Sequence, residues 1–271
     1  MKTFFYGLSI VLFCLSNAAQ ATGPRVTSHL FEKPENEIFA LDFPIVLSSE
    51  SENGGVAAEI IKAAFKNENV ENTITPLPLQ TMISYYLDEE NALAIVGHDL
   101  DLNSTETKNV ILIPILRLKE SYFYFRPKHE TLTWTGNLSA FKGLTLGLHK
   151  NNMSAAYEKF GIIIEQDRLA ARINNLISGK SDVVRESNLT MENLLKTHFV
   201  DQQKNVVKLE PSAGEALIIL AFNKKNPKGI ELAKSFQKGL SKLTATHEYN
   251  DILKKYTGDA PIEMYFNPLS R

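Results

Sequence analysis

The sequence lacks the residues of a disulfide-stapled scaffold and has no excess charge of one sign. Its only cysteine, Cys14, lies inside an apolar N-terminal segment, so the chain beyond that segment has no thiol for a disulfide or a cysteine-ligated zinc ion. The 29 Lys and Arg against 31 Asp and Glu give a formal charge of −2, which provides no field to attract nucleic acid. With 44% hydrophobic positions, 14 Gly and 11 Pro, the composition excludes collagen and disorder.

The first 21 residues have the pattern of a secretory signal peptide. Lys2 precedes an apolar run from Phe4 to Leu15, and Ala19-Gln20-Ala21 offers the small residues that signal peptidase accepts. The apolar run is shorter than the roughly 20 residues needed to span a bilayer. We therefore expect cleavage after Ala21 and export to a periplasm, where a chain without disulfides is stabilised by its core.

Strands and helices alternate along the rest of the chain. In the first half, strand patterns occupy 38–41, 72–75 and 92–96, and helical stripes begin at Val56 and Leu79. In the second half, strand patterns occupy 144–148, 162–164 and 182–184, with helices around Tyr157 and over 169–177. Two strands of strong β character, 121–125 and 216–222, lie between and after these halves, and two helical stripes, 233–243 and 249–256, follow. This alternation predicts an α/β fold with mostly parallel sheets covered by helices.

Short motifs occur in a characteristic order between Glu37 and Gly258. They are Phe43-Pro44, Gly54-Gly55 before Glu59, Thr105-x-x-Lys108, Leu138 to Gly143, Leu176-x-x-Gly179-x-x-Asp182, and Tyr249-x-x-Ile252-x-x-x-Tyr256. In order and spacing the chain resembles the type 2 periplasmic-binding fold, and in particular the family 3 extracellular solute-binding proteins, which deliver polar amino acids to ABC importers.

The resemblance implies two lobes, each a mixed and mostly parallel sheet flanked by helices, joined by two crossing strands. After the signal peptide (1–21), residues 22–120 would form the first part of lobe 1, 121–217 lobe 2, and 218–271 the C-terminal part of lobe 1. A monomer of this kind holds one small polar ligand between the lobes and delivers it to an inner-membrane ABC permease. No cofactor and no metal are implied.

The resemblance also implies ligand-binding positions in lobe 1. The family's carboxylate-binding Arg corresponds here to Lys108, three residues after Thr105, and lysine keeps the charge without the bidentate geometry. A solvated Lys at a turn is an equally good interpretation. His98 and Asp99 end a buried strand and would face the cleft, or form only a local pair. Phe43 would offer the solute an apolar face or simply pack beside Pro44.

In lobe 2 the family's Gly-Thr-Thr helix start corresponds to Asn151-Asn152-Met153, where Met153 offers no hydroxyl. Asn152 would help to bind the ligand or simply cap the helix. The family's ammonium-binding Asp corresponds to Ser187, and the nearest carboxylate is Glu186, which strict alternation would turn away unless a bulge intervenes. Asp42, Asp99 or Glu215 would be substitutes, although each is typical of a surface or turn acid. These departures put an ordinary α-amino acid ligand in doubt.

No catalytic or metal-binding pattern is readable elsewhere. Ser178-Gly179-Lys180-Ser181 lacks the earlier glycine of a phosphate loop, and the six His have no metal-ligand spacing. Trp134 is expected in a surface loop. We expect a binding protein rather than an enzyme; the alternatives are a sensory or interaction subunit, or an enzyme recruited onto the same fold.

Overall fold

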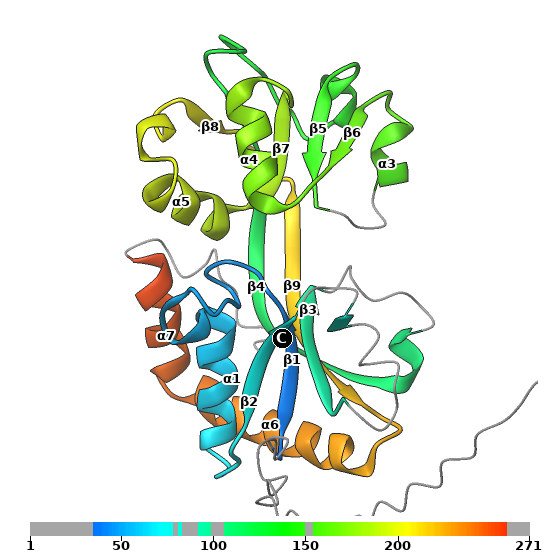
Figure 1. Ribbon diagram of the computed structural model, residues 1–271, viewed down its shortest axis with the longest axis vertical. Helices are drawn as coiled ribbons and strands as arrows, with labels where there is room; N and C mark the ends of the chain where they lie inside the picture. Colours follow the sequence, from blue (N-terminus) through cyan, green and yellow to red (C-terminus); the bar gives the residue numbers. More distant parts are fainter. Residues whose placement is uncertain (1–34, 78–80, 83–91, 99–105, 150–153, 259–271) are drawn as a thin grey trace, which may run out of the picture. The chain divides into compact units, whose positions relative to one another are not determined.

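The computed structural model describes residues 35–77, 81–82, 92–98, 106–149 and 154–258 (Figure 1). Several predictions fall outside these ranges: the signal peptide, most of the helix from Leu79, and four candidate site residues, namely Asp99, Thr105, Asn151 and Asn152.

One mixed sheet contains the strands of the described residues, in the order β2-β1-β3-β9-β4-β7-β5-β6, with β8 paired to β4. The strands are β1 (Glu37–Leu41), β2 (Thr73–Leu77), β3 (Ala94–His98), β4 (Val110–Phe125), β5 (Thr145–Leu148), β6 (Ile163–Gln166), β7 (Val183–Ser187), β8 (Val206–Lys208) and β9 (Gly214–Asn223). The helices are α1 (Val56–Lys66), α3 (Ser154–Glu158), α4 (Leu169–Ser178), α5 (Asn188–Thr197), α6 (Pro227–Ala245) and α7 (Glu248–Thr257), with short 3₁₀ turns at Glu52–Gly54, Glu106–Asn109, Leu138–Phe141 and Val200–Gln202.

Two parallel groups of strands are joined by an antiparallel pair. β1 is parallel to β2 and β3, and β5 is parallel to β6 and β7. β9 is antiparallel to both β3 and β4, and β4 leaves β9 at Glu120, where it continues antiparallel to β7. Figure 1 shows β4 and β9 running together from one group to the other. The two-lobed α/β fold with two crossing strands is therefore confirmed.

The first crossing strand is much longer than the predicted 121–125. β4 begins at Val110. It includes Pro114, Arg117 and Lys119, which interrupt the apolar sequence pattern that would predict a buried strand. The register with β9 shifts between Pro114 and Leu116, so the proline lies at an irregularity where a strand tolerates it.

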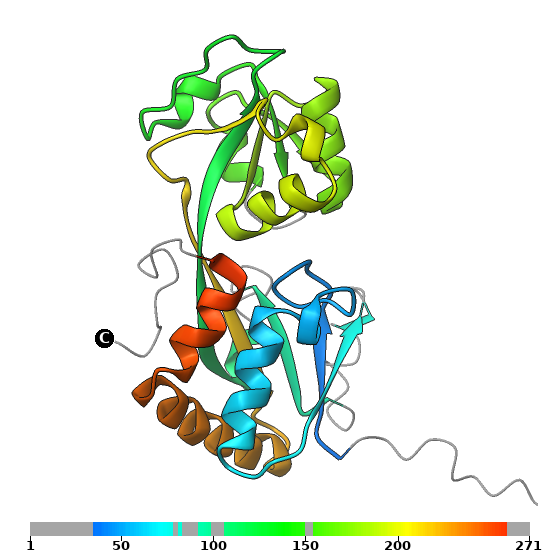
Figure 2. The ribbon, with the colours of Figure 1, turned by 90° about the vertical axis from the view of Figure 1, so that its left-hand side faces the viewer.

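Lobe 1, built on β1, β2 and β3, is covered by α1, α6 and α7 (Figure 2). α6 approaches α1 closely at Gly239, where an added Cβ would lie 1.9 Å from the Ala64 carbonyl oxygen. The two C-terminal helices thus belong to the core built around the first strands. Within the described residues, no helix combines the length and the hydropathy needed to cross a bilayer.

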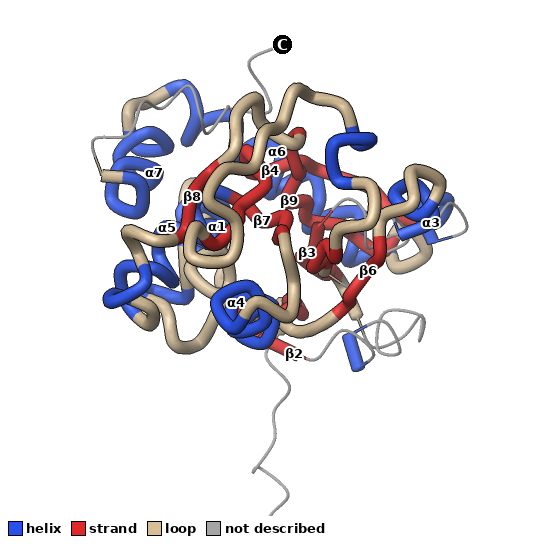
Figure 3. Tube along the Cα trace, turned by 90° about the horizontal axis from the view of Figure 1, so that it is seen from above, coloured by secondary structure: helices blue, strands red, loops and turns tan. Residues whose placement is uncertain are grey.

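Lobe 2, built on β5, β6 and β7, has helices on both sides of its strands (Figure 3). Trp134 belongs to its core and is 8% exposed, so the expectation of a surface residue was wrong. Its ring stacks on Phe141 with centroids 4.9 Å apart, and its Nε1 donates a hydrogen bond to the Pro211 carbonyl oxygen at 2.7 Å. Pro211 lies 77 residues further along the chain, so this hydrogen bond depends on tertiary folding. α5 and β8 were not predicted.

Candidate functional site

The loop between β1 and α1 is held in place by the start of the helix. The first two amides of α1 donate hydrogen bonds to the carbonyl oxygens of Ile45 and Val46, each at 2.9 Å. Gly55, which precedes the helix, has φ 94°, and a Cβ there would lie 2.7 Å from both carbonyl oxygens. Only glycine permits this approach without strain. The Gly54-Gly55 motif therefore positions the loop that carries Phe43.

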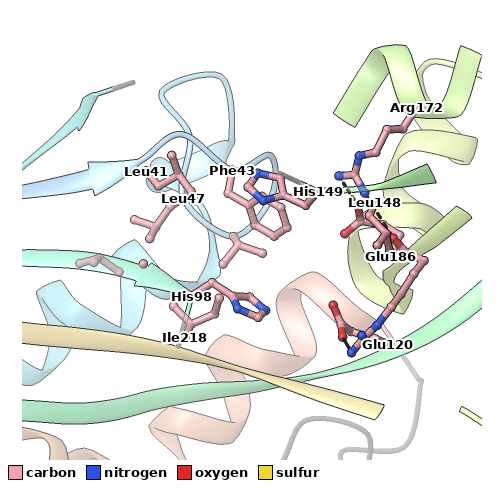
Figure 4. Close-up of a pocket in the computed structure, with 14 residues that line it drawn as sticks. Leu41, Phe43, Leu47, His98, Glu120, Leu148, His149, Arg172, Glu186 and Ile218 are labelled. Atoms are coloured by element: carbon pink, nitrogen blue, oxygen red, sulfur yellow. Dashed lines mark hydrogen bonds and ion pairs between the residues drawn. The ribbon is translucent and has the colours of Figure 1, made fainter. Parts of the chain in front are cut away.

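A cavity lies where the carboxyl ends of β1, β3, β5 and β7 meet (Figure 4). The space open to the centres of water-sized molecules is about 60 Å³. One water needs roughly 10–15 Å³ on this measure, so the cavity has room for a small solute or several waters. It is lined by Leu41, Phe43, Val46, Leu47, Val96, Gly97, His98, Glu120, Leu148, His149, Arg172, Arg185, Glu186 and Ile218. The carboxyl ends of strands are the usual ligand position in open α/β sheets.

The two walls of the cavity differ in polarity. The wall from lobe 1 is apolar apart from His98, with side chains from the ends of β1 and β3, the following loop and β9. The opposite wall carries four charged side chains, namely Glu120, Arg172, Arg185 and Glu186, beside Leu148 and His149. An apolar surface thus faces a charged one, an arrangement typical of pockets in which a few polar groups orient a ligand.

Arg172 and Glu186 form a buried ion pair. Arg172 Nη2 lies 2.8 Å from Glu186 Oε2, and the two side chains are 1% and 5% exposed. Arg172 Nη1 donates to the Arg185 carbonyl oxygen at 3.2 Å, and the Ser187 amide donates to Glu186 Oε1 at 2.9 Å. Arg172 Nε has no hydrogen-bond partner in the described part of the chain. A buried N–H without a partner costs free energy, so the Arg172–Glu186 pair is not fully satisfied by the described residues.

A second ion pair joins Arg185 to Glu120 where the crossing strands meet lobe 2. Arg185 Nη2 contacts the Glu120 carboxylate, and Arg185 Nη1 donates to the Tyr157 hydroxyl at 2.6 Å. Burial by itself would lower the pKa of Arg185, but the Glu120 carboxylate and Tyr157 outweigh it and raise that pKa above its ordinary value. Arg185 therefore stays charged. Burial also raises the pKa of the neighbouring Tyr122.

Three of the predicted site residues lie together at the cavity: Phe43, His98 and Glu186. Glu186 reaches it without a bulge, because β7 keeps an unbroken register with β4 from Val183 to Ser187. Its position next to the last residue of the strand, rather than an irregular backbone, brings its carboxylate to the cavity.

The other described candidates lie off the cavity lining. Asp42 and Lys108 are exposed. Glu215 is also exposed and pairs with Arg117 at 2.6 Å. Ser187 is 2% exposed and caps α5, its hydroxyl accepting from the Thr190 amide at 3.1 Å.

Sequence reasoning missed Glu120, His149, Arg172 and Arg185. One signal was available for Arg172, because it falls between Leu169 and Leu176 on the apolar stripe of the predicted helix 169–177. A charged residue at a core position is worth attention, since such residues are seldom buried unless paired. Among the residues that the structure describes, no three His, Cys, Asp or Glu side chains gather to hold a metal ion.

No protein-family model matches the sequence, and the curated proteins offer no significant match. Solved structures do match. The ligand-binding core of GluR0 from Nostoc punctiforme, in complex with L-glutamate, has a TM-score of 0.64 at 12% identity over 82% of this chain and 98% of that one. A mutant of ArgBP from T. maritima has a TM-score of 0.64 at 15% identity over 83% and 95%. A histidine kinase sensor domain with similarity to periplasmic binding proteins has a TM-score of 0.64 at 16% identity over 82% and 96%.

The chain thus has the two-lobed fold of periplasmic binding proteins. At these identities the likeness concerns the fold, and what the chain binds has to be argued from its own residues.

Proposed function

We propose that this chain is a periplasmic solute-binding protein of the family 3 type, which holds one small solute in the cavity and delivers it to an inner-membrane ABC permease. The observation that carries the proposal is a cavity whose two walls come from different lobes, at the carboxyl ends of the strands of both. A solute that contacts both walls binds the closed arrangement better than the open one, and so favours closure.

The proposal includes a hinge at the crossing strands and lobe boundaries near 120 and 217. β4 exchanges β9 for β7 as its partner at Glu120, opposite Gly214. Glu120 lines the cavity and pairs with Arg185, so the crossing point is in direct contact with the binding site. Phe43, His98 and Glu186 are proposed to contact the solute. The proposal also includes export after cleavage at Ala21 and a monomeric state. It further includes ligand-binding roles for Asp99, Thr105, Asn151 and Asn152.

Thermal shift on the purified chain tests solute binding. A ligand at 100 times its Kd stabilises by about 2.7 kcal/mol, which for a chain of this size raises Tm by about 5–11 °C. The screen should include amino acids, small amines and organic acids. Phe43→Ala, on the cavity wall, is expected to reduce the shift, while Glu248→Gln on the exposed start of α7 should leave it unchanged. Failure of every class of solute to stabilise the chain would refute a binding function.

A sensory subunit is the second candidate, favoured by the histidine kinase sensor domain among the structural neighbours. The two candidates differ in what the loaded protein stimulates. Adding it to inner-membrane vesicles from the source cells should accelerate ATP hydrolysis and uptake of the solute if it serves an importer. Stimulation of histidine phosphorylation without uptake would favour the sensor.

A further inference from the structure

We propose that the solute is an uncharged molecule with an apolar body and one hydrogen-bonding group, of the kind represented by a short branched or aromatic alcohol. This inference rests on the proposed binding function and adds the class of ligand. It departs from the polar amino acids that the family resemblance implies.

The charged side chains that line the cavity are paired with one another. Arg172 pairs with Glu186 at 2.8 Å, and Arg185 pairs with Glu120. These four are the Asp, Glu, Lys and Arg residues of the lining in the described part of the chain, and their formal charges sum to zero. An ion that entered the cavity would lose its hydration and would have to compete with a pair that is already formed.

The polar atoms of these pairs are engaged within the protein or withdrawn from the cavity. Glu186 Oε1 accepts a hydrogen bond from the Ser187 amide at 2.9 Å, and Arg185 Nη1 donates to the Tyr157 hydroxyl at 2.6 Å. Arg172 Nη1 donates to the Arg185 carbonyl oxygen at 3.2 Å, and the Nε and Nη2 atoms of Arg172 are buried from solvent. The ion pairs therefore form a preassembled wall rather than a binding site for a ligand carboxylate or ammonium.

The facing wall indicates an apolar ligand body. Leu148 lines the cavity from lobe 2, and six apolar side chains line it from lobe 1, namely Leu41, Phe43, Val46, Leu47, Val96 and Ile218. An aliphatic or aromatic group gains free energy when it is buried against them, whereas a charged group placed there would lose its hydration without gaining a hydrogen bond. Figure 4 shows the apolar side chains of lobe 1 opposite the charged residues.

Two histidines provide polar positions suited to an uncharged group. His98 at the end of β3 and His149 just beyond β5 line the cavity from different lobes. A neutral imidazole has one donor and one acceptor nitrogen, and a hydroxyl group can both donate and accept. A ligand hydroxyl can therefore bind either histidine in either sense.

The size of the cavity limits the ligand to a small body. The roughly 60 Å³ open to the centres of water-sized molecules holds about four to six waters. At roughly 30 Å³ of liquid for each water, this is a space of roughly 120–180 Å³, and a cavity of about 150 Å³ holds benzene. The ligand body is therefore about the size of one aromatic ring or of a short branched chain.

Calorimetry on the wild-type chain, with ligands that share one carbon skeleton, tests the inference. 3-Methylbutan-1-ol is uncharged, whereas 3-methylbutan-1-amine and 3-methylbutanoate carry a positive and a negative charge at neutral pH. Benzyl alcohol, benzylamine and benzoate repeat the comparison with an aromatic body, and L-leucine provides a zwitterion. We expect the better of the two alcohols to bind about tenfold or more tightly than its charged counterparts and than leucine, because a charged group loses its hydration without gaining a partner.

A homologous series tests the apolar wall separately. Across 1-propanol, 1-butanol and 1-pentanol, each added methylene should tighten binding by about fourfold, which corresponds to about 0.8 kcal/mol for each buried CH₂. Affinity that does not increase with chain length would contradict burial of the ligand body against lobe 1 and overturn the inference.

One variant tests whether the pairing of charges causes the preference for an uncharged ligand. In Glu186→Gln the Arg172 guanidinium stays charged, since arginine does not deprotonate in proteins, but it loses its counter-charge. Two unit charges about 10 Å apart at an effective dielectric constant of about 20 interact strongly enough for about a tenfold effect. We therefore expect the affinity for 3-methylbutanoate, relative to that for 3-methylbutan-1-ol, to rise by about tenfold. Glu165→Gln is the matched control, because it removes a carboxylate from an ion pair of lobe 2 outside the cavity lining, and it should leave this ratio unchanged.

The outcomes separate this inference from the function on which it rests. A charged counterpart, or leucine, that binds as tightly as the alcohol would overturn the inference while leaving a solute-binding protein. An unchanged affinity ratio in folded Glu186→Gln would overturn the assignment of the ion pair as the cause, and if this variant does not fold, the wild-type panel alone decides the question. Absence of binding by every compound in this panel and in the wider thermal-shift screen would refute the binding function itself.

Discussion

Neutralising one member of the buried Arg172–Glu186 pair should destabilise lobe 2. In Glu186→Gln the side chain keeps its size, but the Arg172 guanidinium, 1% exposed, loses its counter-charge. Breaking a buried pair by removing one partner costs about 3–5 kcal/mol. For a chain of this length each kcal/mol lowers Tm by about 2–4 °C, so we expect a decrease of about 6–20 °C.

A double variant separates the missing partner from a simple packing defect. Arg172→Met with Glu186→Gln removes both charges, and its free energy of unfolding should lie well above the value that the two single variants predict by addition. Urea unfolding followed by tryptophan fluorescence is a suitable assay, since the only tryptophan, Trp134, lies in the core of lobe 2. A loss below about 1 kcal/mol in Glu186→Gln, or strict additivity in the double variant, would refute this reasoning.

Three further changes have outcomes that follow from local geometry. Gly55→Ala should cost about 1–3 kcal/mol and weaken solute binding, because its Cβ would lie 2.7 Å from the Val46 carbonyl oxygen at φ 94°; unchanged stability by urea unfolding would contradict this. Burial alone would raise the pKa of Asp182, but its hydrogen bonds lower it, so this carboxylate stabilises the fold above about pH 4 and progressively less as the pH falls through its folded pKa. The deficit of Asp182→Asn should therefore shrink in acid, and a pH-independent deficit in thermal melts would disprove the assignment. Tyr249→Phe should cost about 1–3 kcal/mol, since it leaves the buried Ile115 carbonyl oxygen without its 2.7 Å donor; chemical denaturation measures the loss, and a neutral substitution would count against it.

Local patterns predicted most of the elements, because a buried face repeats every two residues in a strand and about every 3.6 in a helix. The strand at 144–148 and the helix at 169–177 are close to β5 and α4. The same logic failed on β4, where a proline and alternating charged residues concealed a strand that pairs along β9. α5 was missed because its start depends on the Ser187 hydroxyl at the end of β7, a cap that periodicity does not reveal.

The candidate site was predicted only in part. Phe43, His98 and Glu186 were found because each lies at or just beyond the end of a strand, and strand ends gather at one edge of a parallel sheet. Lys108 and Glu215 had the right chemistry, but the fold leaves both exposed and outside the cavity lining. Arg172 was missed because it lines the cavity as half of an ion pair, and its partner Glu186 lies on another element.

The amino-acid order by itself determined the alternation of strands and helices, the resemblance to two-lobed binding proteins, and the glycine on which the loop before α1 depends. Only the tertiary structure decided which charges face the cavity and which of them are already paired. The reason is physical: hydrophobic periodicity is a local property of the chain, whereas the partner of a buried charge comes from whichever element packs against it, and here α4 brings Arg172 to the end of β7.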